Sequence, residues 1–192
     1  SIETDPLVQA VERMWDAGIV VVCSAGNDGR EGYGTITSPG NSPKVITVGS
    51  LTDKNTLDSS DDFVSTFSSR GPTVGDHVAK PDLIAPGNRI VSLRAANSEL
   101  DKTHKDLRVV APGARGQGDY FELSGTSMAS AVVTGAAALM LEEDPTLNPA
   151  TVKARLMRSA KKLGGNPFDA GAGLLDIDAA LAETGYVADA PS

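Results

Sequence analysis

The sequence has only one cysteine, two histidines and few aromatic residues. A single cysteine excludes an intrachain disulfide and a cysteine-based metal site. Cys23 ends the apolar run 19–23, which predicts a small buried hydrophobe rather than a reactive thiol. Aromatic residues make up 4% of the chain, whereas glycine occurs 20 times. This combination is typical of a tightly turned fold in which backbone segments pack closely.

The chain also lacks an excess of positive charge and a convincing membrane segment. It has 17 Lys and Arg against 25 Asp and Glu, a formal net charge of −8. This balance argues against nucleic acid or an anionic membrane as a partner. The apolar stretch 131–141 is too short, and too rich in Ala, Gly and Thr, to span a bilayer. No signal peptide is visible, and the abrupt start at Ser1 is consistent with the loss of a signal upstream.

The composition and the hydrophobic pattern indicate one soluble α/β domain. The chain has 192 residues, of which 40% are hydrophobic and 22% charged. Asp5 and Pro6 predict the start of a helix. Its apolar face at helical spacing would consist of Leu7, Val11, Met14 and Trp15. The runs 19–23 and 44–49 are typical of strands covered on both faces, so we expect a doubly wound, mostly parallel sheet.

The most informative motif is Ser-Gly-Thr-Ser-Met-Ala-Ser at residues 124–130. The small and apolar residues that follow predict a helix buried on all sides. The first turn of a helix carries unpaired N–H groups and the positive end of the dipole, so a serine there can be a nucleophile if a base reaches it. The alternative is an ordinary serine that caps a buried helix.

Residues 125–129, Gly-Thr-Ser-Met-Ala, resemble the nucleophile motif of the subtilisin-like serine proteases, with Ser127 as the nucleophile. The Ala-Gly-Asn sequence that ends at Asn27 resembles the family's oxyanion-hole segment. This resemblance implies that the Asn27 side-chain amide and the Ser127 backbone N–H stabilise the oxyanion. Without the serine motif, Asn27 would be interpreted as a turn residue.

The same resemblance implies a pocket for the substrate residue that precedes the cleaved bond. The sequence Ser-Pro-Gly at 38–40 matches the family segment at the base of that pocket. The residues implied are Ser24, Ala25 and Gly26 on one wall, with Thr37 and Ser38 at the far end. None of them is charged, so we expect a modest preference for uncharged or apolar side chains.

Further family blocks follow in the family's order, at 68–72, 80–87 and 171–180. The resemblance covers about residues 5–182 and implies a three-layer, doubly wound α/β fold without its N-terminal strands. We expect residues 1–185 to form the C-terminal two-thirds of a subtilisin-like catalytic domain. Within it, residues at about 95–118 are predicted to be a surface insertion, and 186–192 a flexible tail.

The sequence contains no motif for the base that a serine nucleophile needs. Subtilases supply an Asp and then a His upstream of the Ser. His77 and His104 lack the glycines and the helix of the family's His motif, so we expect both to be exposed structural residues. His104 lies near Asp101 and Asp106, but the spacing matches no metal site and predicts solvated loop charges. The isolated chain is therefore expected to be inactive.

Two other functions remain as alternatives. The first is a non-catalytic subtilase-fold fragment or pseudoenzyme that acts as a binding or assembly module. The second is a different class of serine hydrolase, against which the absence of a Gly-x-Ser-x-Gly elbow argues.

The resemblance also implies partners and a location. It implies a polypeptide substrate, a secreted or extracellular location, and calcium as an option in the full-length domain. We expect no cofactor and no metal in this chain, because Lys80 places a positive charge beside Asp82. Loss of the N-terminal strands would expose a sheet edge, so we expect self-association or pairing with the missing N-terminal segment.

Overall fold

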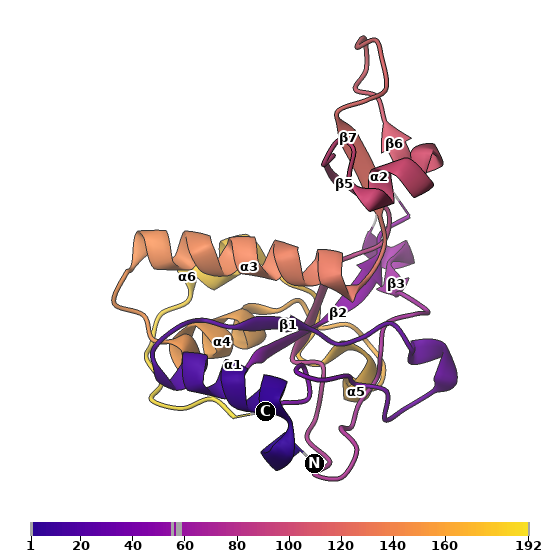
Figure 1. The fold of residues 1–192 in the computed structure, drawn as a ribbon. Coiled ribbons are helices and arrows are strands. Elements are labelled where there is room, and N and C mark those ends of the chain that lie inside the picture. The colour runs from indigo at the N-terminus through magenta and orange to yellow at the C-terminus, as the bar shows by residue number, and fades with distance from the viewer. Residues whose placement is uncertain (1, 55, 57–58, 192) are drawn as a thin grey trace.

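The computed structural model describes residues 2–54, 56 and 59–191. In Figure 1, helix α3 (Thr126–Glu143) runs along one side of a central sheet, and helices α1 (Pro6–Asp16) and α4 (Pro149–Ser159) lie on the other side. Residues 88–123 form a separate arm that projects from the body. None of the described helices is long and apolar enough to cross a bilayer.

The central sheet has strand β2 (Ile46–Thr52) in its middle. Strands β1 (Val22–Ser24) and β4 (Leu83–Pro86) pair with it in parallel, so Val48 lies opposite Ser24 on one edge and opposite Leu83 on the other. The short strand β3 (Phe63–Val64) pairs antiparallel to the end of β2. The predicted parallel core is therefore present.

The prediction of a mostly parallel sheet is nevertheless too simple, because the sheets are mixed. In the arm, β7 (Tyr120–Leu123) pairs antiparallel with both β5 (Ile90–Leu93) and β6 (Arg108–Val109). The loop between β6 and β7 reverses the direction of the chain, as an antiparallel pair of consecutive strands requires.

Helices α1 and α4 begin at side-chain caps that the sequence signals. Asp5 Oδ1 accepts hydrogen bonds from the N–H groups of Leu7 and Val8, and the Asn148 side chain caps α4 in the same way. The predicted apolar face of α1 is only partly correct, because Leu7 and Met14 are exposed and the buried residues are Val8 and Trp15. The remaining short helices are α2 (Glu99–Thr103), α5 (Pro167–Ala170), α6 (Ile177–Ala182) and the 3-10 turns Ile2–Thr4, Gly29–Glu31, Ser59–Asp61 and Lys105–Leu107.

Helix α3 is not buried on all sides, contrary to the prediction. Its buried face includes Val133, Ala136 and Met140, which pack on β1, β2 and β4. The opposite face is exposed, and Leu139 retains 49% of its accessible surface. The other exposed residues of this face are Ser127, Ala131, Thr134, Gly135 and Ala138. Small side chains add little apolar area, so their composition alone did not reveal which face meets water.

The predicted insertion contains a buried charge cluster rather than only solvated loop charges. Asp101, which is 3% exposed, accepts hydrogen bonds from Arg108 Nε at 2.7 Å, Arg94 Nη1 at 3.3 Å and the Asn97 N–H at 2.9 Å. Burial alone would raise the pKa of Asp101, but these hydrogen bonds and the two guanidinium charges hold that pKa below its usual value. The expectation of a solvated Asp101 is therefore wrong.

A second buried cluster joins α4 to the strands. Asp82 Oδ2 lies 2.7 Å from Lys80 Nζ and accepts the Thr47 N–H at 2.7 Å. Asp82 Oδ1 lies 3.4 Å from Lys153 Nζ, and all three charged side chains are 0% exposed. Burial, which disfavours an ammonium ion, lowers the pKa of Lys80 and brings the pKa of Lys153 to about 8, despite the opposing charge of Asp82.

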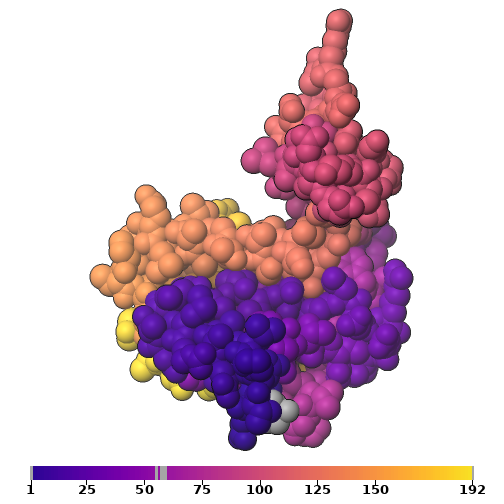
Figure 2. Space-filling model, viewed as in Figure 1, coloured from indigo at the N-terminus to yellow at the C-terminus, as the bar shows by residue number. Residues whose placement is uncertain are grey.

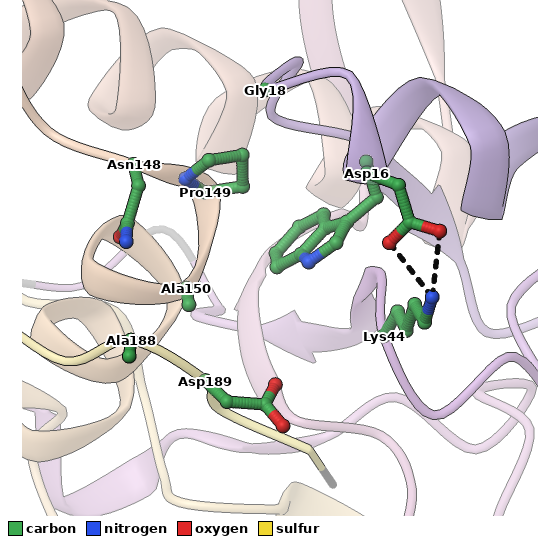
Figure 3. A pocket seen from close by; sticks show the side chains of 9 residues that line it. Asp16, Gly18, Lys44, Asn148, Pro149, Ala150, Ala188 and Asp189 are labelled. Carbon is green, nitrogen blue, oxygen red and sulfur yellow. Dashed lines mark hydrogen bonds and ion pairs between the residues drawn. The ribbon is translucent and has the colours of Figure 1, made fainter.

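The C-terminal segment after α6 returns to α4. The Thr151 hydroxyl donates to the Val187 carbonyl at 3.0 Å, and Asn148 Nδ2 donates to the Tyr186 hydroxyl at 2.8 Å. The flexibility predicted for 186–192 stays a prediction, and its last residue, Ser192, lies outside the described residues. Between this segment, α1 and α4 lies a cavity of 420 Å³ (Figure 3). There Lys44 Nζ pairs with both carboxylate oxygens of Asp16.

We expect the loss of one partner from the buried cluster to destabilise the fold strongly. Lys80→Met should lower the free energy of unfolding by about 3–5 kcal/mol, because it leaves the buried Asp82 short of a partner. The matched control Lys44→Met breaks a pair whose side chains are 38% and 60% exposed, and should cost about 0–1 kcal/mol. Urea unfolding of both variants measures the difference, and equal losses would contradict this role for Lys80.

Candidate functional site

Ser127 lies in the first turn of α3, where it is exposed. The N-cap residue is Gly125, which has no side chain to accept a hydrogen bond from that turn. A Ser or Asp at this position would accept an N–H from the second or third helical residue. As a result, no described residue accepts the Ser127 backbone N–H, and this donor is available at the helix end.

The structure places Asn27 against the start of α3. Asn27 follows β1, and its Oδ1 accepts the Thr126 N–H at 3.0 Å and lies 3.1 Å from the Thr126 hydroxyl. The Thr126 hydroxyl also lies 3.2 Å from both N and O of Gly26. Because these groups occupy Oδ1, the Nδ2 amide of Asn27 is the end of the side chain left to donate. Thr126 thus orients Asn27, a contact that the sequence prediction missed although Thr126 directly precedes Ser127.

The segment after β4 also supports the turn before Ser127. The Gly125 N–H donates to the Gly87 carbonyl at 2.8 Å, one residue after β4 ends. The start of α3 is thereby attached to the ends of two parallel strands, β1 and β4. Ligand sites of open α/β sheets lie beyond such carboxyl ends.

Three of the five predicted pocket residues are joined by direct contacts. The Thr37 N–H donates to the Ala25 carbonyl at 3.0 Å. Gly26 faces Thr37 so closely that a Cβ there would lie 2.8 Å from the Thr37 hydroxyl oxygen. Ser24 ends β1 directly before Ala25.

Ser38 interacts with the residue that caps α1. Its hydroxyl makes a hydrogen bond with Asp5, at the cap of α1, which lowers the pKa of that carboxyl. The side chain therefore takes part in helix capping, and the pocket role of Ser38 stays a prediction.

Neither histidine of the chain is bonded to Ser127, the predicted nucleophile. His77 lies in the turn closed by the Val78 N–H and the Thr73 hydroxyl, and His104 ends α2 in the arm. Within the described residues, no hydrogen bond connects either imidazole to Ser127. The other potential nucleophile, Cys23, is buried, and this burial raises the pKa of its thiol to about 11.

Comparisons with known proteins show the family to which the chain belongs. The model of the Subtilase family matches residues 2–174. The serine protease AprX of Bacillus subtilis (strain 168) is 51% identical over 160 residues, which are 83% of this chain and 34% of AprX. Subtilisin DY of Bacillus licheniformis is 37% identical over 175 residues, which are 91% of this chain and 51% of that protein. The chain thus spans about a third to a half of the length of these relatives.

A solved structure is similar as well. Fervidolysin from Fervidobacterium pennivorans, described as a keratinolytic enzyme related to subtilisin, superposes with a TM-score of 0.69 at 30% sequence identity. The match covers 92% of this chain and 24% of fervidolysin. The fold is a subtilisin-like α/β fold, and the protein is a member of the subtilase family of serine proteases.

The close approach of Gly26 to its neighbours predicts a sensitive position. Gly26→Ala places a methyl 2.7 Å from the Ser69 hydroxyl oxygen, at φ +111°. Gly75→Ala is the matched control, because Gly75 has φ +102° but nothing within 4 Å.

Both substitutions should cost about 1–3 kcal/mol of stability for the backbone conformation. Gly26→Ala should lose about a further 1–3 kcal/mol, because Ser69 and Thr37 are held by hydrogen bonds and cannot move freely. Chemical denaturation measures both losses, and a Gly26→Ala variant as stable as Gly75→Ala would show that the site is loosely packed.

Proposed function

We propose that this chain carries the nucleophile and oxyanion side of a serine endopeptidase site of the subtilisin type. Ser127 Oγ attacks the carbonyl carbon of a peptide bond, while its proton passes to a base. The tetrahedral oxyanion collapses, the C–N bond breaks, and the amine leaves with the proton that the base returns. Water then hydrolyses the acyl-enzyme on Ser127.

The observation that supports this proposal is that two hydrogen-bond donors are available at the start of α3, where the exposed Ser127 lies. They are the unoccupied Ser127 N–H and the Asn27 Nδ2 amide, which Thr126 holds in place. Fixed donors aimed at a developing negative charge lower the barrier without reorganisation during the reaction. In subtilisin itself, the loss of one such donor costs about 10²–10³ in turnover.

The base and its orienting carboxylate are proposed to come from a segment outside this chain. Neither His77 nor His104 is bonded to Ser127, so the 192 residues alone should be almost inactive. Without a base, a serine site retains only the acceleration that the oxyanion hole and binding provide. The uncharged residues around Gly26 and Thr37 support a preference for uncharged or apolar side chains.

The remaining expectations about the whole protein are proposals too. We propose a secreted protein that acts on polypeptides and that pairs with its N-terminal segment or with another copy. Asp82 is an unsuitable cation ligand, since two ammonium groups already contact its carboxylate. A non-catalytic binding or assembly module is the second candidate, favoured by the separation of both histidines from the nucleophile.

Labelling with a fluorophosphonate probe and intact-mass readout tests the proposal. The 192-residue chain should remain unlabelled, whereas a longer form with the upstream region should gain one adduct at Ser127. Ser127→Ala should abolish the adduct. The matched control Ser130→Ala should keep it, because the one hydrogen bond of the Ser130 hydroxyl within the described residues is to the Ser127 carbonyl.

Two results would contradict parts of this proposal. Rapid labelling of the 192-residue chain would mean that His77, His104 or a second copy supplies the base. A longer form that contains the Asp and His motifs and still resists labelling would favour the non-catalytic module.

A further inference from the structure

A largely apolar cavity of 160 Å³ lies under the arm. Figure 2 shows this arm standing away from the body, directly above the start of α3. The cavity is formed by the inner face of the arm sheet, by α2 and by the first turn of α3. The lining residues that matter here are Ile90, Ser92, Leu100, Phe121, Leu123 and Met128.

The cavity adjoins the nucleophile through the chain itself. Met128, which lines it, directly follows Ser127, and Leu123, which also lines it, ends β7 four residues before Ser127. The residues that flank Ser127 on both sides in the chain thus contribute to the cavity lining. Leu93 and Leu100, which are 80% and 42% exposed, add apolar surface to the lining.

The negative charge in the cavity lining is neutralised by neighbouring arginine side chains. Asp101 belongs to the lining, but Arg94 and Arg108 pair with its carboxylate. A cationic side chain that entered would compete with these guanidinium groups, and an anionic one would meet Asp101. An apolar side chain would neither compete with the guanidinium groups nor be repelled by Asp101, and the burial of its apolar surface would favour binding.

The size of the cavity selects a single side chain as the occupant. A cavity of about 150 Å³ lined by Leu, Ile and Phe is large enough to bind benzene. A second copy of the chain would need about 800 Å² of contact surface, far more than one such cavity provides.

We propose that this cavity is a specificity site that accepts one large apolar side chain of the polypeptide bound at Ser127. The inference rests on the proposed function for its polypeptide ligand. It assigns a role to the predicted insertion, because Leu100 and the buried Asp101 of α2 belong to the cavity lining.

NMR of ¹³C-methyl methionine in the 192-residue chain tests this without catalysis. N-acetyl-L-phenylalaninamide should shift the Met128 methyl signal saturably, and N-acetyl-L-aspartic acid amide should not. Met128→Leu assigns the signal. Ser92→Phe should fill the cavity and abolish the shift.

Val91→Phe is the matched control, because it adds the same ring to the neighbouring residue of β5. Successive side chains of a strand point to opposite faces, and Val91 is 47% exposed and outside the lining. The Val91→Phe chain should keep the shift. No shift with the phenylalanine probe, an equal shift with the aspartic acid probe, or a shift that persists in Ser92→Phe would each overturn the proposal.

The experiments distinguish failure of the proposed peptidase function from failure of the proposed specificity site. If Met128 responds as expected but Ser127 in the longer form resists the fluorophosphonate, the apolar site stands and the peptidase function does not. If Ser127 is labelled but Met128 does not respond, the peptidase function stands and the specificity site is wrong.

Discussion

The buried carboxylate of Asp82 is the point at which the layers of this molecule are joined. Lys80 binds it from the same segment, Lys153 approaches it from α4, and the Thr47 N–H of β2 donates to it. Lys153 also donates to the carbonyls of Pro43 and Lys44, just before β2. The starts of β2 and β4 are therefore fixed to each other and to α4. A buried ion pair of this kind specifies an arrangement more than it adds net stability.

This arrangement determines where the functional groups lie. With β1, β2 and β4 in parallel register, their carboxyl ends meet at one edge of the sheet. Asn27 follows β1, and Gly87, which binds the N–H of Gly125, follows β4. The start of α3 is thus held between two strand ends. The proposed oxyanion donors are positioned by the scaffold of the chain itself, whereas the proposed base lies outside it.

The sequence predicted the parts of the molecule that depend on local chemistry. The cap at Asp5, the parallel pairing of β1 with β2, and the position of Ser127 at a helix start follow from short motifs. Family membership also followed from such motifs. The exposed face of α3 did not, because Ala, Gly and Thr fit either a buried or a solvated environment.

Contacts between residues far apart in the sequence were the other feature that the sequence analysis could not predict. The Ser38 hydroxyl bonds to Asp5 across 33 positions, and Asp101 is buried only because Arg94 and Arg108 fold around it. Such partners cannot be read from spacing. For the same reason, Thr126 was not recognised as the group that orients Asn27.

The central claim is that this half of the site is assembled within the 192 residues. Hydrogen exchange of the Thr126 amide, followed by NMR, tests it directly, because this N–H is donated to Asn27 Oδ1. We predict exchange nearly as slow as that of the Ile46 amide in β2, which donates to Val21. Exchange as fast as that of Gly113, at the exposed tip of the arm, would contradict the account.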